Sequence, residues 1–190
     1  MSLFNLFASK KENQKVSNHL KEFLTDFSIE VMPRTASKIE SFKEILPNNT
    51  RVYIAHIEGV PIEEMVQTAK RISNEGFNVM PHFPARIIKD KSTLEQWIKS
   101  YQDEAGIDQA LLLAGGIDKP YGVFENSMQL VETELFEKYN FKNLHFAGHP
   151  EGNKDIDNDG STKNVDQALL WKQKFNERSD AELALTTQFC

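Results

Sequence analysis

Residues 51–83, "RVYIAHIEGVPIEEMVQTAKRISNEGFNVMPHF", decide the fold. The stretch begins and ends with β-prone runs, at 51–57 and 77–83. Between them, Pro61 is a residue favoured in the first turn of a helix, and Gly76 is suited to the left-handed position that ends one. Two strands joined by a helix require a crossover connection, which leaves the strands parallel. The stretch therefore predicts one βαβ unit.

The same alternation of strand and helix extends in both directions. After an amphipathic helix at 10–24, the pattern predicts strands at 27–33, 51–57, 77–83, 109–116, 143–149 and 183–189. The helices between them are expected at 36–46, 61–76, from a capping box of Ser92 and Glu95 through Tyr101, at 122–138 and at 165–175. This alternation is typical of an α/β protein with a parallel sheet covered by helices. We expect one domain spanning 1–190.

Two architectures fit this pattern. The length of 190 residues favours an open, doubly wound parallel sheet, because a complete (βα)8 barrel needs about 250 residues. Polar residues and glycines at nearly every strand end favour a barrel, where all these ends meet around one mouth. They are Glu30, His56, His82, Gly115, Gly116, His149 and Gln188. We expect a TIM-barrel type that is incomplete here, with about five βα units plus strand six, and keep the open sheet as the alternative.

Composition excludes several classes of function. The net charge of −6 argues against a nucleic-acid surface, since phosphate binding needs clustered Lys and Arg. The single cysteine, Cys190, allows no disulfide within the chain, which favours the cytoplasm. No apolar run approaches the roughly 20 residues of a membrane span, so no membrane partner is expected. The oligomeric state is left open, with a homo-oligomer as one option.

Five short motifs, in order along the chain, carry a family resemblance. They are "FSIEVMPRT" (27–35), "MPHFPA" (80–85), "LLLAGG" (111–116), "FAGHPEGNKD" (146–155) and "LTTQF" (185–189). Their order and spacing resemble the methylenetetrahydrofolate reductase family, which folds as a (βα)8 barrel. The resemblance implies a flavin-dependent oxidoreductase that uses FAD and NADH or NADPH to reduce 5,10-methylenetetrahydrofolate to 5-methyltetrahydrofolate, in one-carbon and methionine metabolism.

The resemblance also implies roles for individual residues. Glu30 stands where the family has the acid that assists protonation of the folate, and Gln188 stands where a glutamine contacts the substrate. The cofactor-binding positions correspond to His82, Ala114, Gly115, Gly116, His149, Asn153 and Lys174. A carboxyl in a largely apolar mouth can stay protonated near neutral pH, as a proton donor must.

Five positions depart from the family pattern. Ala55, Ala114, Gly116, His149 and Asn153 replace a threonine, an arginine, an aspartate, a tyrosine and a histidine. These changes remove flavin contacts but leave Glu30 and Gln188 in place. Two alternatives therefore stay open beside the reductase: a folate-binding one-carbon protein without flavin chemistry, and an inactive truncated fragment.

Two further features have structural interpretations that we favour. His56 has no counterpart in the family, so a structural role is expected, and no metal site is expected at the strand ends. The stretch from Asp155 to Asp166 satisfies most of a calcium-binding EF-hand loop, but it follows a strand and not a helix. A solvated turn is therefore the favoured interpretation of this loop.

Overall fold

The structure is a computed structural model that describes residues 19, 22 and 25–187. The expected helix at 10–24 lies almost entirely outside the described residues, and so does Gln188.

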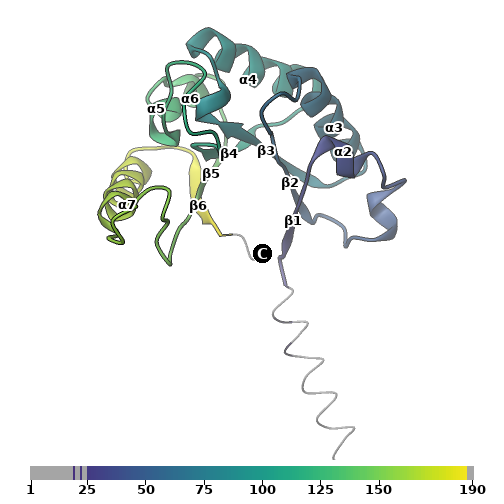
Figure 1. The fold of residues 1–190 in the computed structure, drawn as a ribbon. Helices are drawn as coiled ribbons and strands as arrows, with labels where there is room; N and C mark the ends of the chain where they lie inside the picture. Colours follow the sequence, from purple (N-terminus) through teal and green to yellow (C-terminus); the bar gives the residue numbers. More distant parts are fainter. Residues whose placement is uncertain (1–18, 20–21, 23–24, 188–190) are drawn as a thin grey trace, which may run out of the picture.

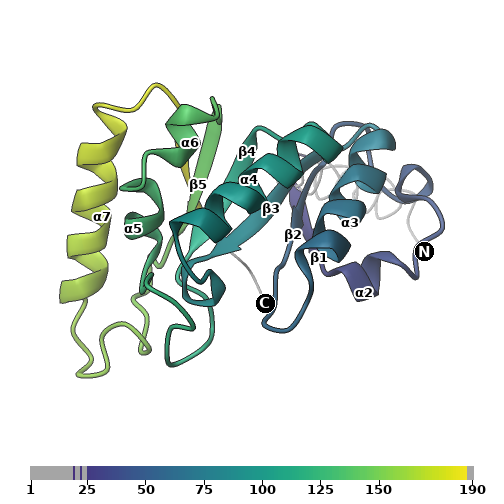
Figure 2. The same ribbon diagram turned by 90° about the horizontal axis from the view of Figure 1, so that it is seen from above.

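Six parallel strands form one sheet, and their spatial order is their order in the chain (Figures 1 and 2). They are β1 (Ser28–Val31), β2 (Arg51–Ile54), β3 (Asn78–Pro84), β4 (Gln109–Leu113), β5 (Asn143–Ala147) and β6 (Glu182–Thr186). A doubly wound sheet reverses its strand order at a switch point. The sequential order found here has no such point, so the open doubly wound alternative is wrong.

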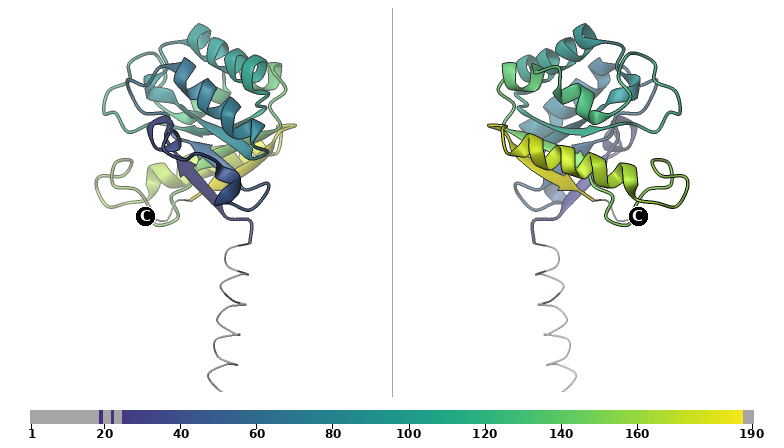
Figure 3. Two further views of the ribbon diagram at one scale, coloured as in Figure 1. Left: turned by 90° about the vertical axis from the view of Figure 1, so that its right-hand side faces the viewer. Right: turned by 90° about the vertical axis from the view of Figure 1, so that its left-hand side faces the viewer.

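The helices lie on the convex side of the sheet, as Figures 1 and 2 show. They are α2 (Pro33–Ala36), α3 (Ile62–Asn74), α4 (Lys91–Ala105), α5 (Ser127–Val131), α6 (Leu135–Lys138) and α7 (Lys163–Asn176), with 3-10 turns η1 (Phe42–Glu44) and η2 (Ala85–Ile87). Figure 3 shows α7 along the outer side of the sheet, beside β6. Among the described residues, no helix has the length and apolar character that crossing a bilayer would require.

The sheet curls into a half-barrel. The clearest measure is the contact between Tyr53 on β2 and Thr186 on β6, whose side-chain oxygens lie 3.0 Å apart although three strands separate β2 from β6. Residues that alternate along each strand therefore face either the helices or the concave side. Outward residues such as Val52, Phe83 and Leu112 belong to the main apolar core, whereas Tyr53, Met80 and Leu111 form a small cluster on the other face.

The expected helix at 36–46 is wrong. The chain forms only the short α2 and η1 there, because contacts from α3 satisfy the backbone in another way. Arg71 on α3 donates hydrogen bonds to the carbonyls of Ala36 and Ile39, and Glu75 accepts one from the Phe42 N–H at 2.7 Å. These tertiary contacts replace the hydrogen bonds that a continuous helix would make within itself.

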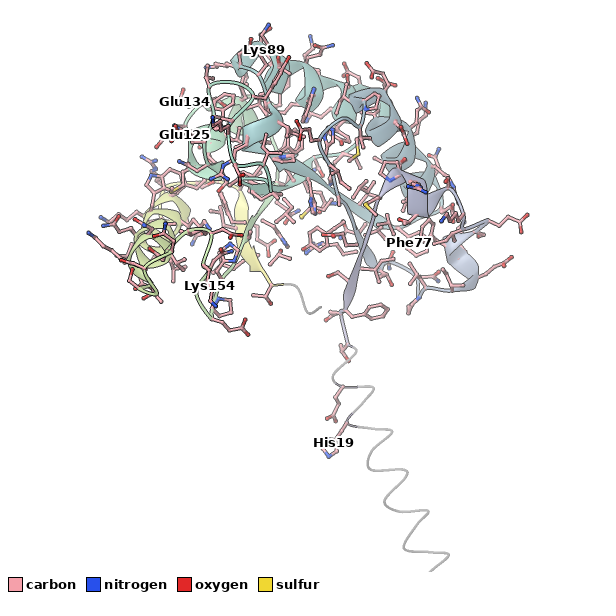
Figure 4. The ribbon with its side chains drawn as sticks, viewed as in Figure 1. His19, Phe77, Lys89, Glu125, Glu134 and Lys154 are labelled. Carbon is pink, nitrogen blue, oxygen red and sulfur yellow. The ribbon has the colours of Figure 1, made fainter. Side chains whose placement is uncertain are left out.

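Two other helix predictions need correction. The expected helix at 122–138 is divided into α5 and α6 by Glu134, whose φ of 61° is left-handed; Figure 4 labels it beside Glu125, which precedes α5.

The cap of α4 is Asp90 and not Ser92, since the Asp90 carboxylate accepts from both the N–H and the hydroxyl of Thr93. An aspartate two residues earlier competes successfully for the N-cap position.

Candidate active site

The structure brings together two of the predicted site residues, Glu30 and His82. They lie on β1 and β3, on either side of β2, and Glu30 Oε2 is 3.3 Å from His82 Nε2. The distance is within ion-pair range, and His82 Nε2 makes no hydrogen bond with any described residue. The Glu30 side chain is 35% exposed while His82 is buried, which places the carboxyl where a ligand can reach it.

A carboxyl and an imidazole at this distance can hold and move a proton together. The imidazole stabilises the carboxylate when it is protonated, and the carboxyl can donate when the imidazole is neutral. Catalytic contacts are often long or poorly aligned in the absence of ligand and shorten when the ligand binds. The pair therefore has the groups that general acid catalysis needs.

A cavity of about 700 Å³ lies at the carboxyl ends of β4, β5 and β6, against α5 and α7. Its volume is within the range of pockets that hold cofactors and other small ligands. Of the residues predicted to bind a cofactor, Ala114 and His149 line it. Apolar side chains form much of its wall, among them Met128, Trp171 and Leu185.

Two basic side chains, Arg86 and Lys172, also line the cavity. Lys172 donates a hydrogen bond of 3.0 Å to the Ala147 carbonyl, and burial lowers the pKa of its amine. Burial, and secondarily the charge of Lys172, lowers the pKa of His149. Arg86 donates from Nη1 to the Ile117 carbonyl at 2.9 Å. The carboxylates of Glu125 and Asp155 line the cavity as well, so its charged side chains are of both signs.

The turn after β4 contains the predicted residues Gly115 and Gly116, which do not line the cavity. Gly115 has a φ of +97°, and a Cβ there would approach the Cβ of Pro84 to 3.2 Å. A Cβ added to Gly116 would meet no atom within 4 Å, so a side chain could be accommodated at this position without a clash. A glycine at position 115 therefore allows the ends of β3 and β4 to lie close together.

The remaining predicted cofactor residues lie away from the cavity wall. Asn153 sits in the loop after β5, where its amide is 3.3 Å from Nδ1 of His149. Lys174 is exposed on α7, beyond the part of the helix that faces the cavity. The prediction for Gln188 falls outside the described residues.

The contacts of His56 with Trp97 and Val60 are those of a histidine with a structural role. Its ring stacks on Trp97 of α4 with centroids 4.6 Å apart, and Nε2 lies 2.9 Å from the Val60 carbonyl. A carbonyl accepts only, so Nε2 carries the proton. Burial, which outweighs the hydrogen bond to Val60, lowers the pKa of His56.

The aspartate-rich loop caps α7. Asp157 is buried, and its two carboxylate oxygens accept from the N–H groups of Asn164 (2.9 Å) and Val165 (3.0 Å) at the start of the helix. A carboxylate in this position offsets the unpaired N–H groups and the positive end of the helix dipole. In the part of the chain that the structure describes, no group of three or more His, Cys, Asp or Glu side chains is placed to hold a metal ion.

The sequence analysis missed a polar network on the concave face. It consists of Arg51 and Tyr53 from β2, His145 from β5 and Thr186 from β6, and we call these four residues the interior network. Each of them lies at an inward position of its strand, so the two-residue alternation around Tyr53 and His145 was the signal that could have found them.

A search against protein-family models found no match to this chain.

Proposed function

We propose that the protein is a folate-linked, flavin-dependent oxidoreductase of the methylenetetrahydrofolate reductase kind, on a (βα)8-type fold. The observation that carries the proposal is the contact between Glu30 and His82, two residues that the resemblance assigns to one active site. The curled parallel sheet supports it. The cavity is not lined by Glu30 or His82, so its use as a cofactor site is a separate part of the proposal with a test of its own.

In this proposal the Glu30 and His82 pair supplies a proton. The proton goes to a ring nitrogen of 5,10-methylenetetrahydrofolate as the bond from that nitrogen to the methylene carbon breaks, and the carbon then accepts a hydride. When bound, the flavin supplies that hydride from NADH or NADPH. The contribution of this chain is to orient the folate against Glu30, hold the proton and exclude water.

The cavity test uses two substitutions on one helix. Ala168 lines the cavity, and Ala168→Phe fills part of it, whereas Leu170 is 57% exposed and does not line it. Titration with FAD, followed by flavin absorbance and fluorescence, should show saturable binding by the wild type and by Leu170→Phe. We expect binding by Ala168→Phe to be at least tenfold weaker. Equal affinity in all three proteins would remove the cavity from the proposal.

The second candidate function that we propose is folate binding in one-carbon metabolism, without flavin chemistry. It is favoured by the positions of Gly116, which has no side chain to contact a flavin, and of Lys174, which is exposed. Binding of 5-methyltetrahydrofolate without any FAD binding would select it. Saturable FAD binding together with oxidation of a nicotinamide would exclude it.

A further inference from the structure

The interior network lies on the concave face, where Figure 1 shows β2 and β6 on opposite sides of the curl. Arg51 Nη1 donates to His145 Nε2 at 3.2 Å. On the other side of the ring, His145 Nδ1 is 2.8 Å from the Tyr53 hydroxyl and 3.0 Å from the Thr186 hydroxyl. The two hydroxyls are 3.0 Å from each other. Four side chains from three strands are thus connected without a carboxylate among them.

Arg51 is a cation without a counter-ion among the described residues. No acidic side chain within 25–187 forms an ion pair with it, and its Nη1 donates to the uncharged acceptor Nε2 of His145. The Nε of Arg51 is buried and has no hydrogen-bond partner. A guanidinium has five N–H donors and stays charged, so a buried donor without an acceptor has a free-energy cost. An anion placed against Arg51 would remove that cost.

The hydrogen count of the network leaves a second donor unused. A guanidinium only donates, so His145 Nε2 must accept, and the ring is neutral with its proton on Nδ1. Burial, and then the charge of Arg51, lowers the pKa of His145 to about 4, in agreement with this neutral form. The imidazole, Tyr53 and Thr186 bring three hydrogens to three contacts, but the single Nδ1–H donates to one hydroxyl, and the two hydroxyls share one hydrogen bond between them, so only two of the three hydrogens are used. One hydroxyl hydrogen, on Tyr53 or on Thr186, has no acceptor within the network.

We infer that the interior network is a binding site for a small oxyanion, a carboxylate or a phosphate group, held by Arg51 and by the unused hydroxyl. Both kinds of oxyanion match the fork of N–H donors on a guanidinium. His145 has a positioning role, because it accepts from Arg51 and directs its own N–H at the hydroxyls. The inference does not depend on the proposed reductase function, since neither Glu30 nor His82 belongs to the network.

The test uses sodium phosphate and sodium formate as probes, against sodium chloride at equal ionic strength. The readouts are the melting temperature of the chain and the Arg Nε–H signals in a ¹H–¹⁵N NMR spectrum. We expect a saturable rise in melting temperature and a saturable shift of the Arg51 Nε–H signal. A response to formate alone assigns the site to carboxylates, and a response to phosphate alone assigns it to phosphate groups.

Three variants complete the test. Arg51→Gln should lose the saturable response, whereas Arg34→Gln should keep it, because Arg34 is exposed on α2. The double variant Tyr53→Phe with Thr186→Val removes both hydroxyls and keeps the charge, so we expect about 3- to 30-fold weaker binding. The inference is overturned if the wild type shows no saturable shift, or if it shows one that Arg51→Gln retains. If Arg51→Gln does not fold, the wild-type NMR titration and the double variant decide the question.

Discussion

Glu30 on β1 and His82 on β3 meet across the intervening strand, with 3.3 Å between Oε2 and Nε2. A pair of this kind, with one side chain partly exposed, contributes about 0.2–1 kcal/mol to stability. We expect a double-mutant cycle of Glu30→Gln and His82→Gln, followed by urea unfolding at about pH 5.5, between the ordinary pKa values of carboxyl and imidazole groups, to give a favourable coupling free energy in this range. Purely additive effects of the two substitutions would contradict a stabilising contact between these side chains.

Capping of α7 by Asp157 gives a second prediction. Asp157→Ala leaves the N–H groups of Asn164 and Val165 without their acceptor, so we expect the free energy of unfolding to fall by about 1–2 kcal/mol. Asp155→Ala is the matched control, because Asp155 is exposed in the same loop, and should change stability by less than about 0.5 kcal/mol. Calcium should not raise the melting temperature of the wild type. A calcium-dependent rise that Asp157→Ala abolishes would instead identify the loop as a calcium site.

The sequence predicts the six strands and helix α3 well because their signals are local. Pro61 and Gly76 mark the two ends of α3 within one βαβ unit, and the strand ends carry Glu30 and His82 to one face of the sheet. The failed prediction at 36–46 has a physical reason: the Arg71 guanidinium, far away in the sequence, satisfies the carbonyls of that segment. Such a contact has no local pattern.

The same distinction applies to the candidate site. A strand-end glutamate is conspicuous in a sequence, but Tyr53 and His145 each resemble ordinary core residues when taken alone. Only the curl of the sheet brings β2 against β6 and makes a network of them. Cavity lining by Lys172 likewise depends on how α7 packs, which its sequence periodicity does not specify.

The glycines after β4 give a third prediction. Gly115→Ala requires an alanine at φ +97° and a Cβ that is 3.2 Å from Pro84, so we expect a loss of about 1–3 kcal/mol in the free energy of unfolding. Gly116→Ala is the control, since its φ is not positive and its Cβ meets nothing within 4 Å. Urea unfolding compares the two variants. Equal stability of both would show that the turn relaxes to accept the side chain.

His145 gives a prediction for the dependence of stability on pH. Its pKa is about 4 in the folded protein and 6.5 in the unfolded chain, so the unfolded chain binds more protons between these values. Stability therefore falls as the pH decreases from 6.5 to 4. His56 and His149, whose pKa values are also lowered, act in the same direction. We expect His145→Gln to flatten this decrease when urea midpoints are compared from about pH 7 to about pH 4, and an unchanged slope would contradict the neutral ring in the interior network.

The most direct test of the proposed function is oxidation of NADH or NADPH by the chain, with FAD and 5,10-methylenetetrahydrofolate present. The proposal predicts folate-dependent oxidation that Glu30→Gln lowers about a hundredfold or more in kcat, with FAD binding unchanged, because the general acid is lost. Glu104→Gln, on the exposed face of α4, should keep the wild-type rate. Absence of folate-dependent oxidation in a wild-type protein that has bound FAD, or a full rate in Glu30→Gln, would contradict it.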